Sequence, residues 1–280
     1  MLKEIIWLTE YELKEYLQEV LQERGYAPVN KEGFLYAPGN VPVMLIAHLD
    51  TVHHKRVETL YVDRKKGVYS SPQGIGGDDR CGVFIILRIL QSITKEGLFP
   101  HILFTEGEEI GGVGATAFTA SGIIPDIKYM IELDRMGRND AVFYSCDNLD
   151  FIEYVEKFKF QESWGSFSDI SIIAPHLKVA ACNLSSGYYS PHTLNESISL
   201  PDMRYNISRV IDMIKDIDNA PKFEYKEKKY RPYRCNSFLW REFGEGECSY
   251  CGEPVIPPRT VCKVCLSLIT DVYKQRNSRM

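Results

Sequence analysis

The sequence contains no apolar run that approaches the ~18 residues of a membrane-spanning helix. Residues 1–20 carry acidic side chains and lack the long apolar segment of a secretory signal. We therefore expect a cytoplasmic protein with no membrane partner. Positive charge is not in excess either, because the formal net charge is -5, and the whole molecule has no basic footprint for nucleic acid. No internal repeat is evident, which argues against a repeat architecture.

Cysteine pairs are absent from most of the chain and gather near its C-terminal end. Four of the 8 cysteines form two C-x-x-C pairs, namely Cys248, Cys251, Cys262 and Cys265. Disulfides are rare in a reducing compartment, so the pairs read as metal ligands and not as four free buried thiols. Four thiolates form a closed, structural zinc site. The segment is too short for a core of its own, so zinc would supply much of its folding free energy.

The length of 280 residues favours one large domain with a small appendage. We expect a large domain over residues 1–220, a linker or extended arm over 221–234 and a zinc ribbon over 235–280. The linker is rich in charge and tyrosine, and its basic residues leave nucleic acid as an alternative partner. Its two glutamates reduce the net positive charge, so we favour a solvated linker over a nucleic-acid-binding segment.

Strand-like and helix-like segments alternate along the large domain. Apolar runs predict strands over 43–47, 101–105, 128–133, 142–146 and 179–184, and a hairpin joins 60–62 to 68–70. Helical periodicity covers 9–24, 79–93, 151–158 and 202–217. This order indicates an α/β fold with a mixed, mostly parallel sheet between layers of helices. Functional groups in such folds gather beyond the carboxyl ends of the strands.

Three candidate segments lie at strand ends or helix starts. His48 and Asp50 follow the first apolar run on one side of the chain, where a carboxylate can orient a metal-bound imidazole. Asp78 and Asp79 end a glycine-rich loop and could cap the next helix or bridge two cations. Residues 106–109 (EGEE) follow another strand. Of two adjacent glutamates there, one can bind metal while the other accepts a proton from water. Alone, each segment has a plain structural explanation, such as a core histidine or a solvated acidic turn.

Two further candidates complete the set. Asp134 ends the strand predicted over 128–133, and His192 lies in the segment Tyr188–Glu196. Carboxylates and imidazoles in this proportion suit zinc or a similar divalent metal. Because most of these segments follow a predicted strand or precede a helix, one sheet can bring them together.

The ordered set H-x-D, G-x-D-D-R, E-E-x-G, a strand-terminal Asp and P-H-T resembles the co-catalytic zinc peptidases over about residues 40–205. That superfamily includes leucyl and glutamyl aminopeptidases. The resemblance implies that His48 and Asp134 hold one metal, that Glu109 and His192 hold the other, and that Asp78 bridges both. It implies Glu108 as the general base and Asp50 as the residue that orients His48. It also implies a cis peptide bond between Asp78 and Asp79.

The resemblance implies hydrolysis of a peptide bond by metal-activated water, most simply by an aminopeptidase acting on short peptides. Two zinc ions would serve this centre, and a third would be structural. The alternatives are hydrolysis of another amide, such as an N-acyl amino acid or a cell-wall peptide, and a non-catalytic zinc-binding module. Assembly into a homo-oligomer is a further possibility. The segments between the motifs are too short for the inserted lid of some relatives, which leaves the substrate open.

Several polar residues have two readings. Ser168-Asp169 could line the pocket or cap a helix. Arg135 could meet a substrate carboxylate or pair with a nearby acid. The other histidines, His53, His54, His101 and His176, match no position of the superfamily and are assigned to the surface or the core.

Overall fold

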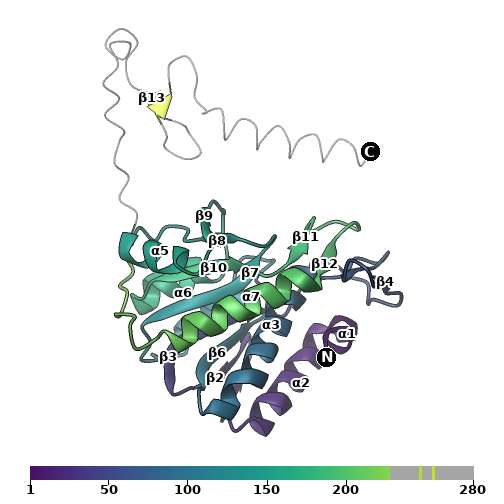
Figure 1. Cartoon of the computed structure of the whole chain (residues 1–280), viewed down its shortest axis with the longest axis horizontal. Coiled ribbons are helices and arrows are strands. Elements are labelled where there is room, and N and C mark those ends of the chain that lie inside the picture. The colour runs from purple at the N-terminus through teal and green to yellow at the C-terminus, as the bar shows by residue number, and fades with distance from the viewer. Residues whose placement is uncertain (228–245, 248–253, 256–280) are drawn as a thin grey trace. The chain divides into compact units, whose positions relative to one another are not determined.

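The computed structural model describes residues 1–227, 246–247 and 254–255 (Figure 1). The chain divides into two compact units, Met1–Lys228 and Lys229–Met280. The second unit contains two short antiparallel strands, β13 (Gly246–Glu247) and β14 (Pro254–Val255). Cys248, Cys251, Cys262 and Cys265 lie outside the described residues. Among the helices that are described, none is long and apolar enough to cross a membrane.

An eight-stranded mixed sheet forms the centre of the first unit, in the order β1-β2-β6-β3-β7-β10-β8-β9. Its four middle strands run parallel, namely β6 (Pro100–Thr105), β3 (Val41–His48), β7 (Tyr129–Arg135) and β10 (Ala181–Ser185). These strands are largely buried on both faces, which is why apolar residues predominate in them. The outer strands are β1 (Val29–Lys31), β2 (Phe34–Ala37), β8 (Asp140–Val142) and β9 (Gln161–Ser163). The predicted α/β fold is confirmed.

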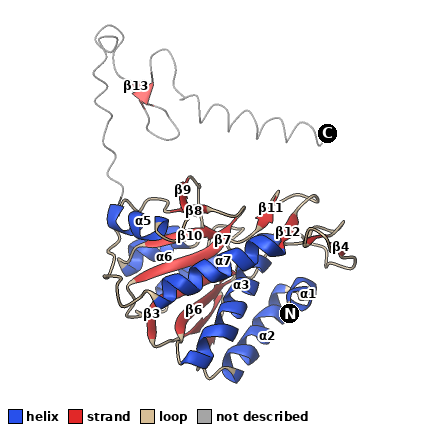
Figure 2. Ribbon diagram, in the orientation of Figure 1, coloured by secondary structure: helices blue, strands red, loops and turns tan. Residues whose placement is uncertain are grey.

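Helices cover both faces of this sheet (Figure 2). Side-chain alternation along β3 shows the division, because Leu45 belongs to one apolar cluster and Met44 and Ile46 belong to the other. The first cluster includes residues of α1 (Leu2–Trp7), α2 (Glu10–Glu23), α3 (Gly77–Ile93), α5 (Leu149–Glu156) and α7 (Leu200–Lys215). The second includes residues of α4 (Val113–Ala120) and α6 (Ile170–Leu177). A short 3-10 helix, Thr94–Glu96, follows α3.

A smaller antiparallel sheet brings distant segments to the same end of the molecule. Its order is β11-β12-β5-β4, with β11 at Tyr188–Tyr189, β12 at Ser197–Ser199, β5 at Val68–Ser70 and β4 at Tyr61–Asp63. The predicted hairpin is confirmed as β4 and β5. Because β12 pairs with β5, the segment that follows His192 lies beside the loop that leads to Asp78.

Residues 221–227, which the sequence analysis assigns to the linker, pack against the first unit. Glu224 and Glu227 form antiparallel bridges with Val179 and Cys146. Phe223 is only 4% exposed, and its ring lies against a group of aromatic side chains, Tyr129, Phe151 and Tyr154. This segment is therefore an extended arm of the large domain, and residues 228–234 of the linker lie outside the described residues.

Candidate metal centre

The five residues expected to bind metal meet at the carboxyl ends of the parallel strands. His48 ends β3, Asp134 lies near the end of β7, and Glu109 follows β6. Asp78 lies at the start of α3, and His192 lies between β11 and β12. The strand register explains the convergence, since β3 is hydrogen-bonded between β6 and β7.

Asp78 is the centre of this arrangement. Its Oδ1 lies 2.9 Å from His48 Nε2, and its Oδ2 lies 3.1 Å from His192 Nε2. Each histidine also faces a second carboxylate, with Asp134 Oδ1 at 3.4 Å from His48 Nε2 and Glu109 Oε1 at 3.1 Å from His192 Nε2. The two halves of the site therefore share Asp78, which is the arrangement that a bridging ligand requires.

Asp79, the alternative bridge, has a different role in the fold. Its Oδ1 accepts a hydrogen bond from the Gly82 amide at 2.8 Å, inside the first turns of α3. Its carboxyl group also lies close enough to His48 and Asp134 to be part of a metal-binding group. Burial and the Asp134 carboxylate raise the pKa of Asp79 well above its ordinary value. The peptide bond between Asp78 and Asp79 is cis, which confirms that prediction.

Asp50 holds two parts of the centre together. Its Oδ1 lies 3.1 Å from His48 Nδ1, so the imidazole is oriented from the side opposite Asp78. The same carboxylate accepts hydrogen bonds from the Glu108 and Glu109 amides, both at 3.1 Å. The turn that carries the two glutamates is thereby fixed to the end of β3.

Glu108 lies beside the expected metal ligands, and its carboxylate has no hydrogen bond or ion pair within the described residues 1–227. Burial and the Asp134 carboxylate raise the pKa of Glu108 to about 9. Burial and Asp78 likewise raise the pKa of Asp134 to about 7. Contacts with the carboxylates of Asp78 and Glu109 raise the pKa of His192 to about 10. Carboxyl groups outnumber imidazoles here, so the site needs additional positive charge.

These observations fit divalent cations. The Oδ2 atom of Asp79 is buried without a hydrogen-bond partner among the described residues. Two imidazoles and three carboxylates form a nitrogen and oxygen donor set of the kind that zinc accepts. One set of ligand atoms, from His48, Asp78 and Glu109, lies mutually within 4.8 Å.

Several polar side chains contact Asp134 and its neighbour Glu132, and the sequence did not predict that they lie together. Asn183, on β10, accepts a hydrogen bond from the Asp134 amide at 2.9 Å, and Tyr188 donates to the Asp134 carbonyl at 3.0 Å. Ser168 donates to the fully buried carboxyl group of Glu132 and lies 3.3 Å from Asp134 Oδ2. The pairs that meet here lie far apart in the sequence, so no local pattern could identify them.

The structure also shows the contacts of the residues for which the sequence left two interpretations open. Asp169 stands at the N-cap position of α6 but makes no side-chain capping bond. Instead its carboxylate accepts a hydrogen bond from Thr105 at the end of β6. Arg135 pairs with Asp140, with 3.5 Å between Nε and Oδ2. His53, assigned to the surface or the core, forms a contact with Glu196 at 2.8 Å.

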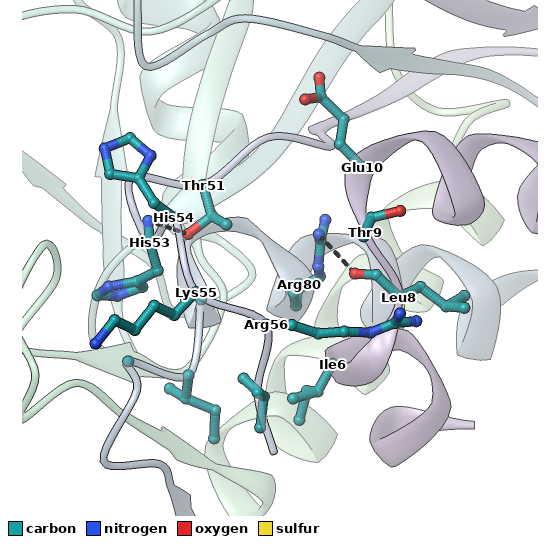
Figure 3. A pocket seen from close by; sticks show the side chains of 14 residues that line it. Ile6, Leu8, Thr9, Glu10, Thr51, His53, His54, Lys55, Arg56 and Arg80 are labelled. Atoms are coloured by element: carbon teal, nitrogen blue, oxygen red, sulfur yellow. Dashed lines mark hydrogen bonds between the residues drawn. The ribbon is translucent and has the colours of Figure 1, made fainter. Parts of the chain in front are cut away.

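Two hollows border the centre. The larger, of about 630 Å³, reaches Asp50 and Glu109 and has carboxylates on its walls, namely Glu10, Glu32 and Glu106. The smaller, of about 270 Å³, lies between the N-terminal helices and residues 51–57 (Figure 3). Arg80 lines it and donates a hydrogen bond to the Leu8 carbonyl at 3.3 Å, which joins the start of α3 to the α1–α2 junction.

Comparison with known proteins agrees with this geometry. The sequence profile of Peptidase family M28 matches residues 36–167, a range that contains four of the five expected ligands. No curated protein sequence matches the chain.

Among solved structures, the aminopeptidase PepT from Bacillus cereus is 16% identical with a TM-score of 0.65, covering 78% of this chain and 97% of that chain. The TET1 peptidase of Pyrococcus horikoshii is 14% identical with a TM-score of 0.60, covering 76% of this chain and 98% of its own. Glutaminyl cyclase from Porphyromonas gingivalis is also 14% identical, with a TM-score of 0.56 and coverage of 76% and 94%. The fold alone therefore does not fix the reaction. The profile match over residues 36–167 and the site geometry together indicate a metal-dependent peptidase.

Proposed function

We propose that this protein is a two-zinc aminopeptidase that removes residues from the amino end of short peptides. The observation that supports it most is the position of Asp78 between the two histidines, at 2.9 Å from His48 Nε2 and 3.1 Å from His192 Nε2. His48 and Asp134 would hold one zinc ion, Glu109 and His192 the other, and Asp78 both. Bound zinc would lower the pKa of coordinated water and polarise the scissile carbonyl.

Glu108 would transfer the proton. Its raised pKa makes it able to accept a proton from water and to donate it to the leaving amine. Bound positive charge would lower that pKa from about 9 toward neutral pH, where a general base works best. Asp50 would keep both His48 and the Glu108–Glu109 turn in place.

The larger hollow supports an exopeptidase acting at the amino end. Its walls carry five carboxylates, Glu10, Glu32, Asp50, Glu106 and Glu109, beside a single histidine, His54. Lys14 forms an ion pair with Glu106 at 2.5 Å, but no lysine or arginine lines this hollow within the described residues. Such a surface is complementary to the α-ammonium group of a peptide and repels a free carboxylate.

The substitution Glu108→Gln tests the proton-transfer role. We expect kcat to fall by about 10²–10⁴-fold, because a general acid–base group contributes that much, while the zinc content stays at the wild-type value. Hydrolysis of aminoacyl anilides and the zinc content of the same preparation would be measured together. Equal loss of zinc and of activity would contradict the role of Glu108.

A substrate panel tests the reaction class. Aminoacyl anilides and dipeptides with a free amine should be cleaved, and N-acyl amino acids should not. Preference for the acylated substrates would favour a deacylase. A zinc-loaded protein that cleaves none of them would favour a binding module.

We also propose a structural zinc held by Cys248, Cys251, Cys262 and Cys265. Support comes from the sequence spacing and from β13 and β14, which pair on either side of Cys248 and Cys251 in the sequence. A cytoplasmic location stays a prediction. Assembly into a homo-oligomer is likewise a prediction. The TET1 peptidase, which has a similar fold, can assemble into a tetrahedron. Nothing in the described residues supports a nucleic-acid partner.

A further inference from the structure

Glu196 is a fully buried carboxylate that lies outside the expected ligand set. Its Oε1 accepts a hydrogen bond from the Asp78 amide, and its Oε2 accepts one from the Gly76 amide, both at 3.0 Å. The same Oε2 lies 2.8 Å from His53 Nε2. Every hydrogen bond of this carboxylate therefore goes to a segment next to the metal centre, and two of them hold the backbone that carries Asp78.

The close packing around this loop shows that its position is fixed. A Cβ atom added at Gly77 would lie 2.8 Å from the Tyr188 Cβ and 3.3 Å from Glu196 Oε1. No side chain fits there, so the loop lies directly against β11 and Glu196. His53 adds a third segment, because it follows β3 and lines the smaller hollow (Figure 3).

We propose that Glu196 and His53 are positioning residues of the metal centre. In this Glu196–His53 clamp, Glu196 fixes the Asp78 backbone so that the two carboxylate oxygens face His48 and His192, and His53 fixes Glu196. The clamp joins the three segments that carry His48, Asp78 and His192. Neither residue would touch a metal, and the inference rests on the proposed function only in taking Asp78 as the shared ligand.

Cobalt(II) titration of the full-length, metal-depleted chain tests the clamp. Cobalt bound by carboxylates and imidazoles absorbs without the thiolate charge-transfer bands of a four-cysteine site, so the two kinds of site are read separately. Glu196→Gln keeps the side-chain volume but turns one acceptor into a donor that faces a backbone N–H. We expect cobalt affinity at the carboxylate–imidazole centre to fall about 10–100-fold, as for other groups that support metal ligands. Circular dichroism should be unchanged.

Asp63→Asn is the matched control. Asp63 also accepts hydrogen bonds from two backbone amides, Lys65 and Lys66 at 2.9 and 3.1 Å, but it ends β4 and has no contact with the centre. It should bind cobalt like the wild type. Wild-type affinity in folded Glu196→Gln would overturn the proposal.

His53→Ala gives a second test that leaves the two backbone hydrogen bonds of Glu196 in place. It should weaken cobalt binding by less than Glu196→Gln does, and the double variant should be no weaker than Glu196→Gln alone, because His53 acts through Glu196. If Glu196→Gln does not fold, wild-type cobalt affinity in His53→Ala overturns the clamp. Wild-type protein that binds two cobalt ions here but hydrolyses no peptide contradicts the proposed aminopeptidase and not the clamp.

Discussion

Neighbouring carboxylates of this site make different contacts because their side chains point in different directions. Glu109 Oε1 lies 3.1 Å from His192, whereas the adjacent Glu108 carboxylate faces the cluster without a partner among the described residues. Asp78 contacts both histidines, whereas Asp79 accepts a hydrogen bond from an amide of α3. In each pair, one residue contacts His192 and its neighbour does not, although Asp79 also lies within 4.8 Å of His48 and Asp134.

The buried Asp169 should make the stability of the folded chain depend on pH. Burial raises the pKa of Asp169 to about 6 from an ordinary 3.8, so its ionisation costs the folded state stability as pH rises between these values. The full cost is about 3 kcal/mol, at about 1.4 kcal/mol per pKa unit. Asp169→Asn removes the charge and keeps an acceptor for Thr105. Its stability relative to wild type should therefore increase from pH 4 to pH 7.

Urea unfolding of both metal-depleted proteins at these two pH values measures this difference. Ser171, whose hydroxyl accepts a hydrogen bond from the Ser168 amide at 3.3 Å, offers a neutral comparison on the same turn, because the effect of Ser171→Ala should not depend on pH. A pH-independent difference between Asp169→Asn and wild type would show that this carboxyl group titrates normally.

At the scale of elements, sequence periodicity predicts long segments better than short ones. The strands β3, β6 and β7 contain apolar runs, and the predicted helices over 9–24 and 79–93 correspond to α2 and α3. The helix α4 is short and contains a glycine and two threonines, while α6 contains Pro175, which argues against a helix. Both were missed because packing against β-strand side chains, and not intrinsic propensity, stabilises them.

The arm 221–227 should contribute to the stability of the large domain. Phe223 packs against Tyr129, Phe151 and Tyr154 and is nearly inaccessible to water. Phe223→Ala should lower the free energy of unfolding by about 3–5 kcal/mol, the usual cost of removing a buried phenylalanine. Thermal or urea unfolding measures it.

The neighbouring residue is the control. The Lys222 side chain is 54% exposed, so Lys222→Ala should change stability by no more than about 0.5 kcal/mol. Similar small effects for both substitutions would mean that residues 221–227 are a detached linker after all.

The proposed active-site ligands and the two cysteine pairs are different sets of residues, so the two kinds of zinc site should be separable by mutation. Full-length protein should contain three zinc ions, and the double substitution Cys248→Ser and Cys251→Ser should reduce that number to two. Peptidase activity should persist, because the proposed ligands of the active site all come from the first unit. Elemental analysis with parallel assays measures both quantities. Two zinc ions in the wild type would contradict the structural site.

The sequence alone determined the fold class and the residues that converge on the centre. Their motifs stand at strand ends, and parallel strands bring such ends to one edge of a sheet. Only the tertiary structure distinguished Asp78 from Asp79 by contact, and only it identified Glu196, which binds the Gly76 amide 120 residues away. The physical reason is that a ligand's identity follows from local chemistry, whereas its orientation depends on hydrogen bonds between segments that meet only in the folded chain.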